Sequence, residues 1–436
     1  MTGALIGFAA LFALILLRMP IAFAMVLVGF VGFAVLTDWG PAAAMVGITT
    51  FDAGFAYALS VIPLFILMGN FVVRANLSHE LFDAAYAFLG HRRGGLAMAS
   101  VVACGGFSAV SGSSLATAAI MSKVAMPPMR RFGYHDSLAA GSIAAGGTLG
   151  ILIPPSVILI IYGLLTNTDI GRLFIAGILP GILGIAMYVG AVAVATRLKP
   201  ELGPPGERMS WGERLRALKA VWAIVLLFLI VIGGLYGGVF TPTEAGGIGA
   251  AAAFLFALAR RALTWRALGE VLIESARTTA MLFAVIIGAL VFAHFVNLAG
   301  LPAALAGWID ALGASPYLVL FAIIAIYMVL GCVLESLSMI LLTVPVFYPV
   351  ILALDFGLDR GSALIWFGIL VTMVTEISLI SPPVGMNVFV LRGVLGDVPL
   401  ATIFRGVTPF LIADVLRVAL VIAVPAIALL LPSLMS

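Results

Sequence analysis

Long apolar runs, separated by short stretches rich in polar residues, glycine and proline, are the main pattern along the chain. The runs are apolar all round, rather than on one helix face or at alternate positions. This predicts lipid-buried helices, not the amphipathic helices of a soluble fold or the strands of a transmembrane barrel. At about 20 residues per crossing, ten spanning helices are expected, near residues 3–17, 19–37, 57–75, 137–165, 174–196, 221–239, 242–259, 278–297, 362–392 and 404–432.

Two further apolar stretches, near residues 94–130 and 316–352, are interrupted in the middle by polar and small residues. We expect arms of about 13 residues in the first stretch, or roughly 20 Å of helix, which is too short for a core about 30 Å thick. Each stretch is therefore predicted to be a re-entrant hairpin whose tip lies at membrane depth. Such irregular backbone is tolerated only where it packs in protein or faces a watery cavity.

The distribution of Lys and Arg predicts the orientation, because cytoplasmic loops carry an excess of these residues. With the N-terminus outside, only Arg172 and Arg360 fall in outer loops, and Lys123 lies near a hairpin base. Both termini are therefore predicted to be periplasmic. The inner loops then receive Arg18, Arg74, Arg92, Arg93, Arg130, Arg131, Arg197, Lys199, Arg208, Arg214, Arg216, Lys219, Arg260, Arg261, Arg266, Arg277, Arg392 and Arg405.

The two halves of the chain share landmarks at offsets of 222 to 229 residues. Because each half holds five crossings and one hairpin, the second copy starts on the opposite side, and such an inverted repeat is typical of secondary transporters. We predict a first repeat at 1–196, a cytoplasmic linker at 197–220 and a second repeat at 221–436. The matching landmarks are Pro20 with Pro242, Phe132-Gly133 with Phe356-Gly357, Pro154-Pro155 with Pro382-Pro383, and Pro180 with Pro409.

Composition agrees with this all-α polytopic membrane fold. Hydrophobic residues make up 63% of the 436 residues and charged residues 9%, against roughly 45–50% and about 25% in soluble domains. The net charge of +3 suggests no nucleic-acid partner, and membrane lipid is the expected surrounding. No ATP-binding or metalloprotease motif is found, so we expect neither an enzyme nor a cofactor. Isolated charges such as Asp414 are interpreted as capping or interface residues.

Hydroxyl groups and glycines concentrate at the middle of the first hairpin. Ser and Thr oxygens and free carbonyls are the hard ligands that an alkali cation needs, and helix N-termini at the same point favour an anion. Small residues also allow helices to pack closely, but close packing does not require five hydroxyls between positions 108 and 117. The candidate binding residues here are Ser108, Ser111, Gly112, Ser113, Ser114 and Thr117.

The second hairpin offers Glu335, Ser336, Ser338 and Thr343 at the equivalent place, with Ser336 and Ser338 in the positions of Ser111 and Ser113. The correspondence is looser than between the other landmarks. Glu335 is an ionisable group in an apolar stretch, which is costly unless it is paired or hydrated. It is either a coupling-ion ligand or a structural partner near the interface, and the sequence leaves both open.

Two Pro-Pro pairs interrupt long apolar segments, one in each half. Each proline removes a backbone donor and crowds the carbonyl four residues earlier, so the pairs should unwind their helices and free carbonyls as cation ligands. A harmless kink is the alternative, but the same pair stands in both halves beside glycines and hydroxyls. The candidates at these breaks are Gly147, Thr148, Pro154 and Pro155, and Ser381, Pro382, Pro383, Gly385 and Asn387.

At these motifs the sequence resembles the large membrane subunit of the tripartite ATP-independent periplasmic (TRAP) transporters. The resemblance covers essentially the whole chain and is specific because several motifs occur together. Those motifs are Ile62-Pro63-Leu64-Phe65-Ile66-Leu67-Met68-Gly69-Asn70, Ala109-Val110-Ser111-Gly112-Ser113-Ser114, Gly150-Ile151-Leu152-Ile153-Pro154-Pro155-Ser156, Phe240-Thr241-Pro242-Thr243-Glu244-Ala245 and Ser381-Pro382-Pro383-Val384-Gly385.

The resemblance implies sodium-coupled uptake of an organic acid across the bacterial inner membrane. It implies two partners, a periplasmic substrate-binding protein and a small four-helix membrane subunit, and an elevator motion of the hairpins and broken helices. Implied sodium ligands come from the Ser111–Thr117 tip with the Gly147–Pro155 break, and from the Ser336–Thr343 tip with the Ser381–Asn387 break. Two alternatives are a stand-alone divalent-anion symporter or exchanger, and a membrane assembly subunit that transports nothing.

Overall fold

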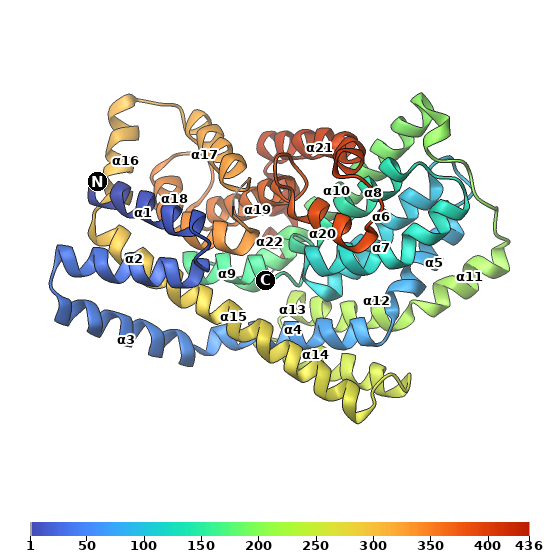
Figure 1. The fold of residues 1–436 in the computed structure, drawn as a ribbon, viewed down its shortest axis with the longest axis horizontal. Coiled ribbons are helices and arrows are strands. Elements are labelled where there is room, and N and C mark those ends of the chain that lie inside the picture. The colour runs from blue at the N-terminus through green and yellow to red at the C-terminus, as the bar shows by residue number, and fades with distance from the viewer. Residues whose placement is uncertain (1, 333, 436) are drawn as a thin grey trace.

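The computed structural model describes residues 2–332 and 334–435, and within them every regular element is a helix (Figure 1). Seven of these helices are long and apolar enough to cross a membrane, and one bent pair makes an eighth. The prediction of an all-α polytopic membrane protein is confirmed. Ten crossings were predicted, and part of the difference lies in α1 and α2, whose 15 and 16 residues fall short of the roughly 20 that a perpendicular crossing needs.

The chain begins with five helices. The third and the fifth of them were not predicted. The third was missed because Gly40-Pro41 in its first turn and Asp52 near its end make it less apolar than its neighbours. Proline is tolerated in a first turn, where its missing N–H has no helical partner. The Asp38 carboxylate caps the helix by accepting from the Trp39 N–H at 2.8 Å. The five are α1 (Thr2–Leu16), α2 (Ile21–Leu36), α3 (Trp39–Phe55), α4 (Val61–Arg74, after the 3-10 turn Tyr57–Ser60) and α5 (Leu77–Leu89).

The first predicted hairpin is a helix-turn-helix, and the helix after it is broken at the proline pair as predicted. The chain reverses at Gly112, whose φ of 60° lies in the left-handed region. The arms have 17 and 18 residues, so the expectation of about 13 was wrong: the glycines and serines beside the tip are helical. The elements are α6 (Gly95–Ser111), α7 (Ser114–Arg131), α8 (Asp136–Thr148), the 3-10 turn Leu149–Ile151, α9 (Val157–Thr166) and α10 (Ile170–Leu198).

The second half has the same order of a helix pair, a broken helix and a long helix, as the predicted repeat requires. Its inverted orientation stays a prediction. The predicted span 404–432 is divided near Pro425, because proline cannot continue a helix. The elements are α11 (Trp211–Ala220), α12 (Trp222–Phe228), a π-helical turn (Leu229–Gly233), α13 (Gly234–Tyr236), α14 (Pro242–Ala259), α15 (Trp265–Leu298), α16 (Leu301–Leu312), α17 (Pro316–Leu330), α18 (Ser336–Ala353), α19 (Arg360–Ser378), α20 (Met386–Leu395), α21 (Leu400–Ala423) and α22 (Ala426–Ser433).

The helices form two groups that meet along α4 and α15. The 34-residue α15 packs against α2, α3 and α4, and α14 packs against α4. Figure 1 shows α3, α4, α14 and α15 along the lower edge of the view, with the hairpins and broken helices above them. In that second group the halves of the chain interlock, since α8 packs on α21, α7 on α20 and α9 on α18.

The predicted linker 197–220 is an ordered strap followed by a helix. The Gly94 N–H donates to the Gly203 carbonyl and the Gly206 N–H to the Gly90 carbonyl, both at 2.8 Å. Arg214 of α11 donates from Nε to the Ala87 carbonyl at 3.0 Å. These contacts fasten the strap to α5 and to the base of the first hairpin.

The two halves approach each other closely at the crossing of α8 with α21, which depends on two glycines. A Cβ added at Gly141 would overlap the Gly406 carbonyl, and one added at Gly406 would overlap the Ser137 carbonyl. Small residues of this kind let membrane helices approach to backbone contact. The crossing therefore leaves no room for any side chain at either position.

We expect Gly406→Ala to destabilise the purified protein, because the added methyl must separate α8 from α21, and overpacking of this kind costs about 1–3 kcal/mol. Gly190→Ala in α10 is the matched control, since a Cβ there meets no atom within 4 Å and alanine favours a helix by up to ~1 kcal/mol. Thermal unfolding in detergent measures both. Equal melting temperatures for the two variants would show that the crossing is not tightly packed.

Candidate functional site

A cavity of about 350 Å³ lies where both hairpin tips and both helix breaks meet α4 and α15. It brings together segments that are more than 200 residues apart in the chain. Its lining is mainly apolar, with a few convergent polar groups, as is usual for small-molecule sites. The polar side chains and glycines that line it are Gly69, Asn70, Ser111, Gly112, Ser113, Ser114, Glu274, Thr278, Glu335 and Ser336.

Four helices begin at this cavity. Ser114, Val157, Ser336 and Met386 are the first residues of α7, α9, α18 and α20, and all four line it. The N-terminus of a helix carries a partial positive charge and free N–H groups, so it favours an anion. The arrangement therefore presents four such ends to one small volume.

Helix C-termini reach the same cavity. Ser111 is the last residue of α6, and Leu379 directly follows the end of α19. Carbonyl groups at such ends lack helical partners and carry partial negative charge, which favours a cation. One cavity thus offers donor groups suited to an anion beside acceptor groups suited to a cation.

The first tip is held against the first break by close backbone contacts. A Cβ added at Gly112 would lie 3.1 Å from the Pro155 carbonyl oxygen, and one added at Gly150 would lie 3.1 Å from the Ser113 carbonyl carbon. Ser111 Oγ is 2.9 Å from Thr117 Oγ1 across the turn. Hydroxyl and carbonyl oxygens of tip and break therefore gather within one small region.

The second tip meets the second break in a comparable way. The Cys332 thiol lies 3.8 Å from the Pro382 carbonyl oxygen. Glu335 occupies the N-cap position of α18, lines the cavity, and accepts a hydrogen bond from Ser338 Oγ at 3.2 Å. The two roles left open for Glu335 both remain, because it combines a structural contact with access to the cavity.

Seven of the predicted candidates line the cavity: Ser111, Gly112, Ser113, Ser114, Pro155, Glu335 and Ser336. The other twelve do not line the cavity and stay candidates. Asn387 Nδ2 donates to the Ala144 carbonyl at 3.0 Å, which joins the second break to α8. Thr343 donates to the Tyr327 hydroxyl at 2.6 Å, between the two arms of the second hairpin. The remaining ten are Ser108, Thr117, Gly147, Thr148, Pro154, Ser338, Ser381, Pro382, Pro383 and Gly385.

The sequence patterns missed three polar residues of the cavity, Asn70, Glu274 and Thr278. They lie on α4 and α15. Asn70 and Thr278 fall in the predicted spans 57–75 and 278–297, Glu274 precedes the second of these spans, and Asn70 was noted only within a family motif. Asn70 Nδ2 donates to Ser275 Oγ at 2.8 Å and so ties α4 to α15. The i, i+4 spacing of Glu274 and Thr278 is a signal that would have placed both on one helix face.

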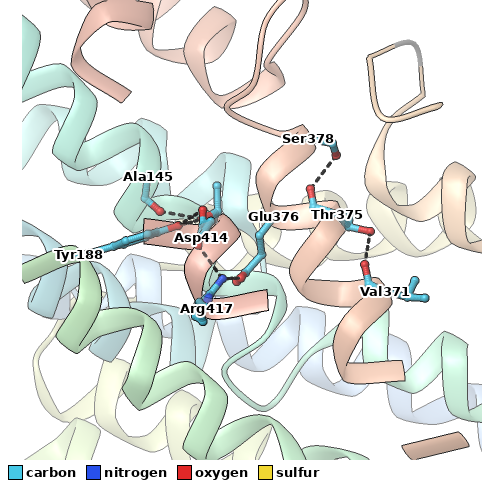
Figure 2. Close-up of polar contacts among 9 residues, drawn as sticks. Ala145, Tyr188, Val371, Thr375, Glu376, Ser378, Asp414 and Arg417 are labelled. Carbon is cyan, nitrogen blue, oxygen red and sulfur yellow. Dashed lines mark hydrogen bonds and ion pairs between the residues drawn. The ribbon is translucent and has the colours of Figure 1, made fainter. Parts of the chain in front are cut away.

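A second polar group, deeper in the protein, was also missed (Figure 2). Glu376 of α19, Asp414 and Arg417 of α21 and Tyr188 of α10 are all fully buried. Arg417 pairs with both carboxyl groups, and Tyr188 donates to Asp414 at 2.6 Å. The interpretation of Asp414 as a capping or interface residue was wrong. Its i, i+3 spacing to Arg417 was the available signal, whereas Glu376 arrives only through the tertiary fold.

Comparisons with solved structures place the fold among membrane transporters. The chain is similar to the Alcanivorax borkumensis YdaH transporter, with a TM-score of 0.59 and 15% identity over 91% of this chain and 89% of that one. It is also similar to MtrF of Neisseria gonorrhoeae, with a TM-score of 0.55 and 12% identity over 88% and 84%. At these identities the likeness concerns the fold alone.

Sequence comparisons identify the family. The model of the tripartite ATP-independent periplasmic transporter, DctM component, matches residues 8–427. The C4-dicarboxylate TRAP transporter large permease of Pseudomonas aeruginosa is 38% identical over 88% of both chains. The sialic acid large permease of Vibrio cholerae is 34% identical over 100% of this chain and 99% of that one, and the ectoine large permease of Halomonas elongata is 34% identical over 86% of both. These relatives are named as permeases rather than enzymes, and the chain belongs to the TRAP transporter large permease family.

Proposed function

We propose that this protein is the permease subunit of a sodium-coupled symporter that moves an organic carboxylate across the bacterial inner membrane. The observation that carries the proposal is the convergence of four helix N-termini with helix C-termini and hydroxyl groups on one cavity. Such a site suits a carboxylate and a cation together. The solutes named for the relatives, C4-dicarboxylate, sialic acid and ectoine, each carry a carboxylate.

The charges around the cavity support co-transport with a cation. Glu274 and Glu335 are the charged side chains among the described lining residues. A carboxylate entering such a site meets like charges, so helix N-termini, Asn70 and hydroxyls must bind it without help from a basic side chain. Bound cations would remove the repulsion, because an opposite charge within about 4–6 Å stabilises an anion.

We place the sodium ions where each tip meets its break. In the first half the ligands would be oxygens of Ser111 and Ser113 with carbonyls of the Gly147–Pro155 break. In the second half they would come from Ser336 and Ser338 with the Ser381–Asn387 break. The contact of Gly112 with the Pro155 carbonyl brings the two parts of the first site together.

Delivery by a periplasmic binding protein and association with a small membrane subunit follow from the family. Exposed aromatic residues along α3, among them Trp39, Phe51 and Phe55, offer an apolar face for lipid or for that subunit. The cavity lies between the α4–α15 group and the group of hairpins and broken helices. We therefore infer that the second group moves as an elevator against the first.

We expect Ser111→Ala or Ser113→Ala to weaken sodium activation of uptake roughly ten- to a hundredfold, since one lost ligand oxygen is worth about 1–3 kcal/mol. Docking of the binding protein should be unchanged. Thr408→Ala is the control, because Thr408 is exposed on α21 and bonds only to the Phe404 carbonyl. Uptake measured against sodium concentration decides the matter. An unchanged sodium dependence in both tip variants would return these serines to a packing role.

The orientation is tested by labelling single cysteines in intact cells, with Cys332 replaced by serine. Arg208→Cys in the strap should be protected from an impermeant reagent, and Arg360→Cys at the start of α19 should react, because the basic residues gather on the inner side. Both positions are exposed, so access within the protein is not limiting. The opposite labelling pattern would refute periplasmic termini.

Reconstitution tests dependence on partners. Liposomes holding this chain alone should show no uptake under a sodium gradient, and addition of the small subunit with a loaded binding protein should restore it. Radiolabelled C4-dicarboxylate, sialic acid and ectoine, each with its own binding protein, are the substrates to compare. Uptake by the chain alone would favour a stand-alone symporter.

A further inference from the structure

The buried cluster of Glu376, Asp414, Arg417 and Tyr188 lies apart from the cavity, since none of its members lines it. It sits where α8, α10, α19 and α21 meet, and each of its four side chains has 0% exposure. Figure 2 shows Asp414 and Arg417 between Tyr188 on one side and Glu376 on the other. Because these side chains have no access to solvent, their charges can be balanced only by groups within the cluster.

Two carboxyl groups share a single guanidinium here. Within the described residues, the charged groups that act on Glu376 are Arg417 and Asp414, and the charged group that acts on Asp414 is Arg417. All three act on Tyr188. Two of the other packed elements carry a charge that is engaged elsewhere: Asp136 of α8 pairs with Arg130 at 2.9 Å, and Arg392 of α20 donates to the Val398 carbonyl at 3.1 Å. The hydroxyls of Tyr162 and Tyr327 also bond elsewhere, to the Leu364 carbonyl and to Thr343. With both carboxyl groups ionised, the fully buried cluster would hold one uncompensated negative charge, which is strongly unfavourable.

The surroundings of the two carboxyl groups differ. Asp414 has a donor group beside each oxygen: Oδ2 accepts from the Tyr188 hydroxyl at 2.6 Å, and Oδ1 lies 2.9 Å from Arg417 Nη2 in an ion pair that lacks hydrogen-bond geometry. Glu376 uses only Oε2, which accepts from Arg417 Nη2, while Oε1 has no hydrogen-bond partner among the described residues. A buried oxygen without a hydrogen bond has a higher free-energy cost in an ionised carboxylate than in a neutral carboxylic acid, because charged groups have the larger desolvation penalty.

The position of the guanidinium is set by packing. A Cβ added at Gly184 of α10 would overlap Arg417 Nη1, so the group fills the space that this glycine leaves. Its other neighbour is the Tyr188 ring, with the ring centroid 5.8 Å from Arg417 Cζ. Arg417 therefore cannot shift freely to give each carboxyl group a separate pair of donors.

We propose that the cluster is a binding site for one proton, held on Oε1 of Glu376 throughout transport. Glu376 is then a neutral carboxylic acid whose Oε2 accepts from Arg417, and Asp414 with Arg417 forms the ion pair. The cluster as a whole is neutral. This inference does not rest on sodium coupling or on the identity of the solute.

The bound proton has a structural consequence for both halves of the chain. Tyr188 also lies 3.4 Å from Thr148 Oγ1, at the end of α8 where the first break begins. Glu376 stands two residues before the end of α19, where the second break begins. The neutral cluster thus connects the two helix ends that lead into the breaks, without placing a net charge beside them.

Replacing each of the two acids by its amide gives opposite expectations. Glu376→Gln replaces a neutral group with a neutral group of the same shape, so uptake by the complete transporter should stay within twofold of wild type, with a similar melting temperature. Asp414→Asn removes the only counter-ion of Arg417, so uptake should fall at least tenfold and the melting temperature should drop. The reverse order, equal losses, or equal tolerance would each overturn the proposal.

An infrared measurement tests the proton without any substitution. Wild-type protein at neutral pH should show a carbonyl stretch of a protonated carboxylic acid, and carboxyl-labelling of glutamate with ¹³C should shift that band. Labelling of aspartate should leave it in place. In Glu376→Gln the band should be missing. A band that shifts with aspartate, or no difference between wild type and Glu376→Gln, would show that Glu376 carries no proton.

Discussion

Backbone groups inside a membrane must find hydrogen-bond partners within the protein, and the rest of this structure depends on that constraint. Two helices are interrupted by proline pairs, and two helix pairs reverse direction at a tip. The backbone groups of these four stretches therefore cannot all find hydrogen-bond partners within their own helix. The fold places all four around a single cavity, where tips and breaks contact each other and the remaining groups face the space between them. The interruptions that would be unfavourable in lipid become the polar lining of one site.

The same constraint governs charge. Acidic groups at the cavity edge, Glu274 and Glu335, have access to the cavity, whereas Glu376 and Asp414 have no exposure at all. At the cavity, a mobile cation can balance the charge and leave again, which suits a transport cycle. In the buried cluster, Arg417 and a bound proton balance the charge, which suits a permanent connection between helices.

The interlocking of the halves explains why neither is self-sufficient. The α8–α21 crossing relies on Gly141 and Gly406, the Asn387 amide bonds to α8, and the buried cluster draws on α10, α19 and α21. The contacts between the two halves join residues that are more than 200 positions apart in the chain. The contacts among Glu376, Asp414 and Arg417 lie within the second half. The helices that support the site are therefore shared between the two halves of the chain.

The sequence by itself determined the membrane class, the two helix pairs and the two proline breaks, because apolar runs and paired prolines act locally on hydrogen bonding. It also located seven of the residues that line the cavity. The tertiary structure decided what no local pattern carries: that the tips and breaks share one cavity, that α4 and α15 complete it with Asn70, Glu274 and Thr278, and that Glu376 meets Arg417. A single polar residue in an apolar helix gives no sign of its partner, since the partner is chosen by how helices pack and not by spacing along the chain.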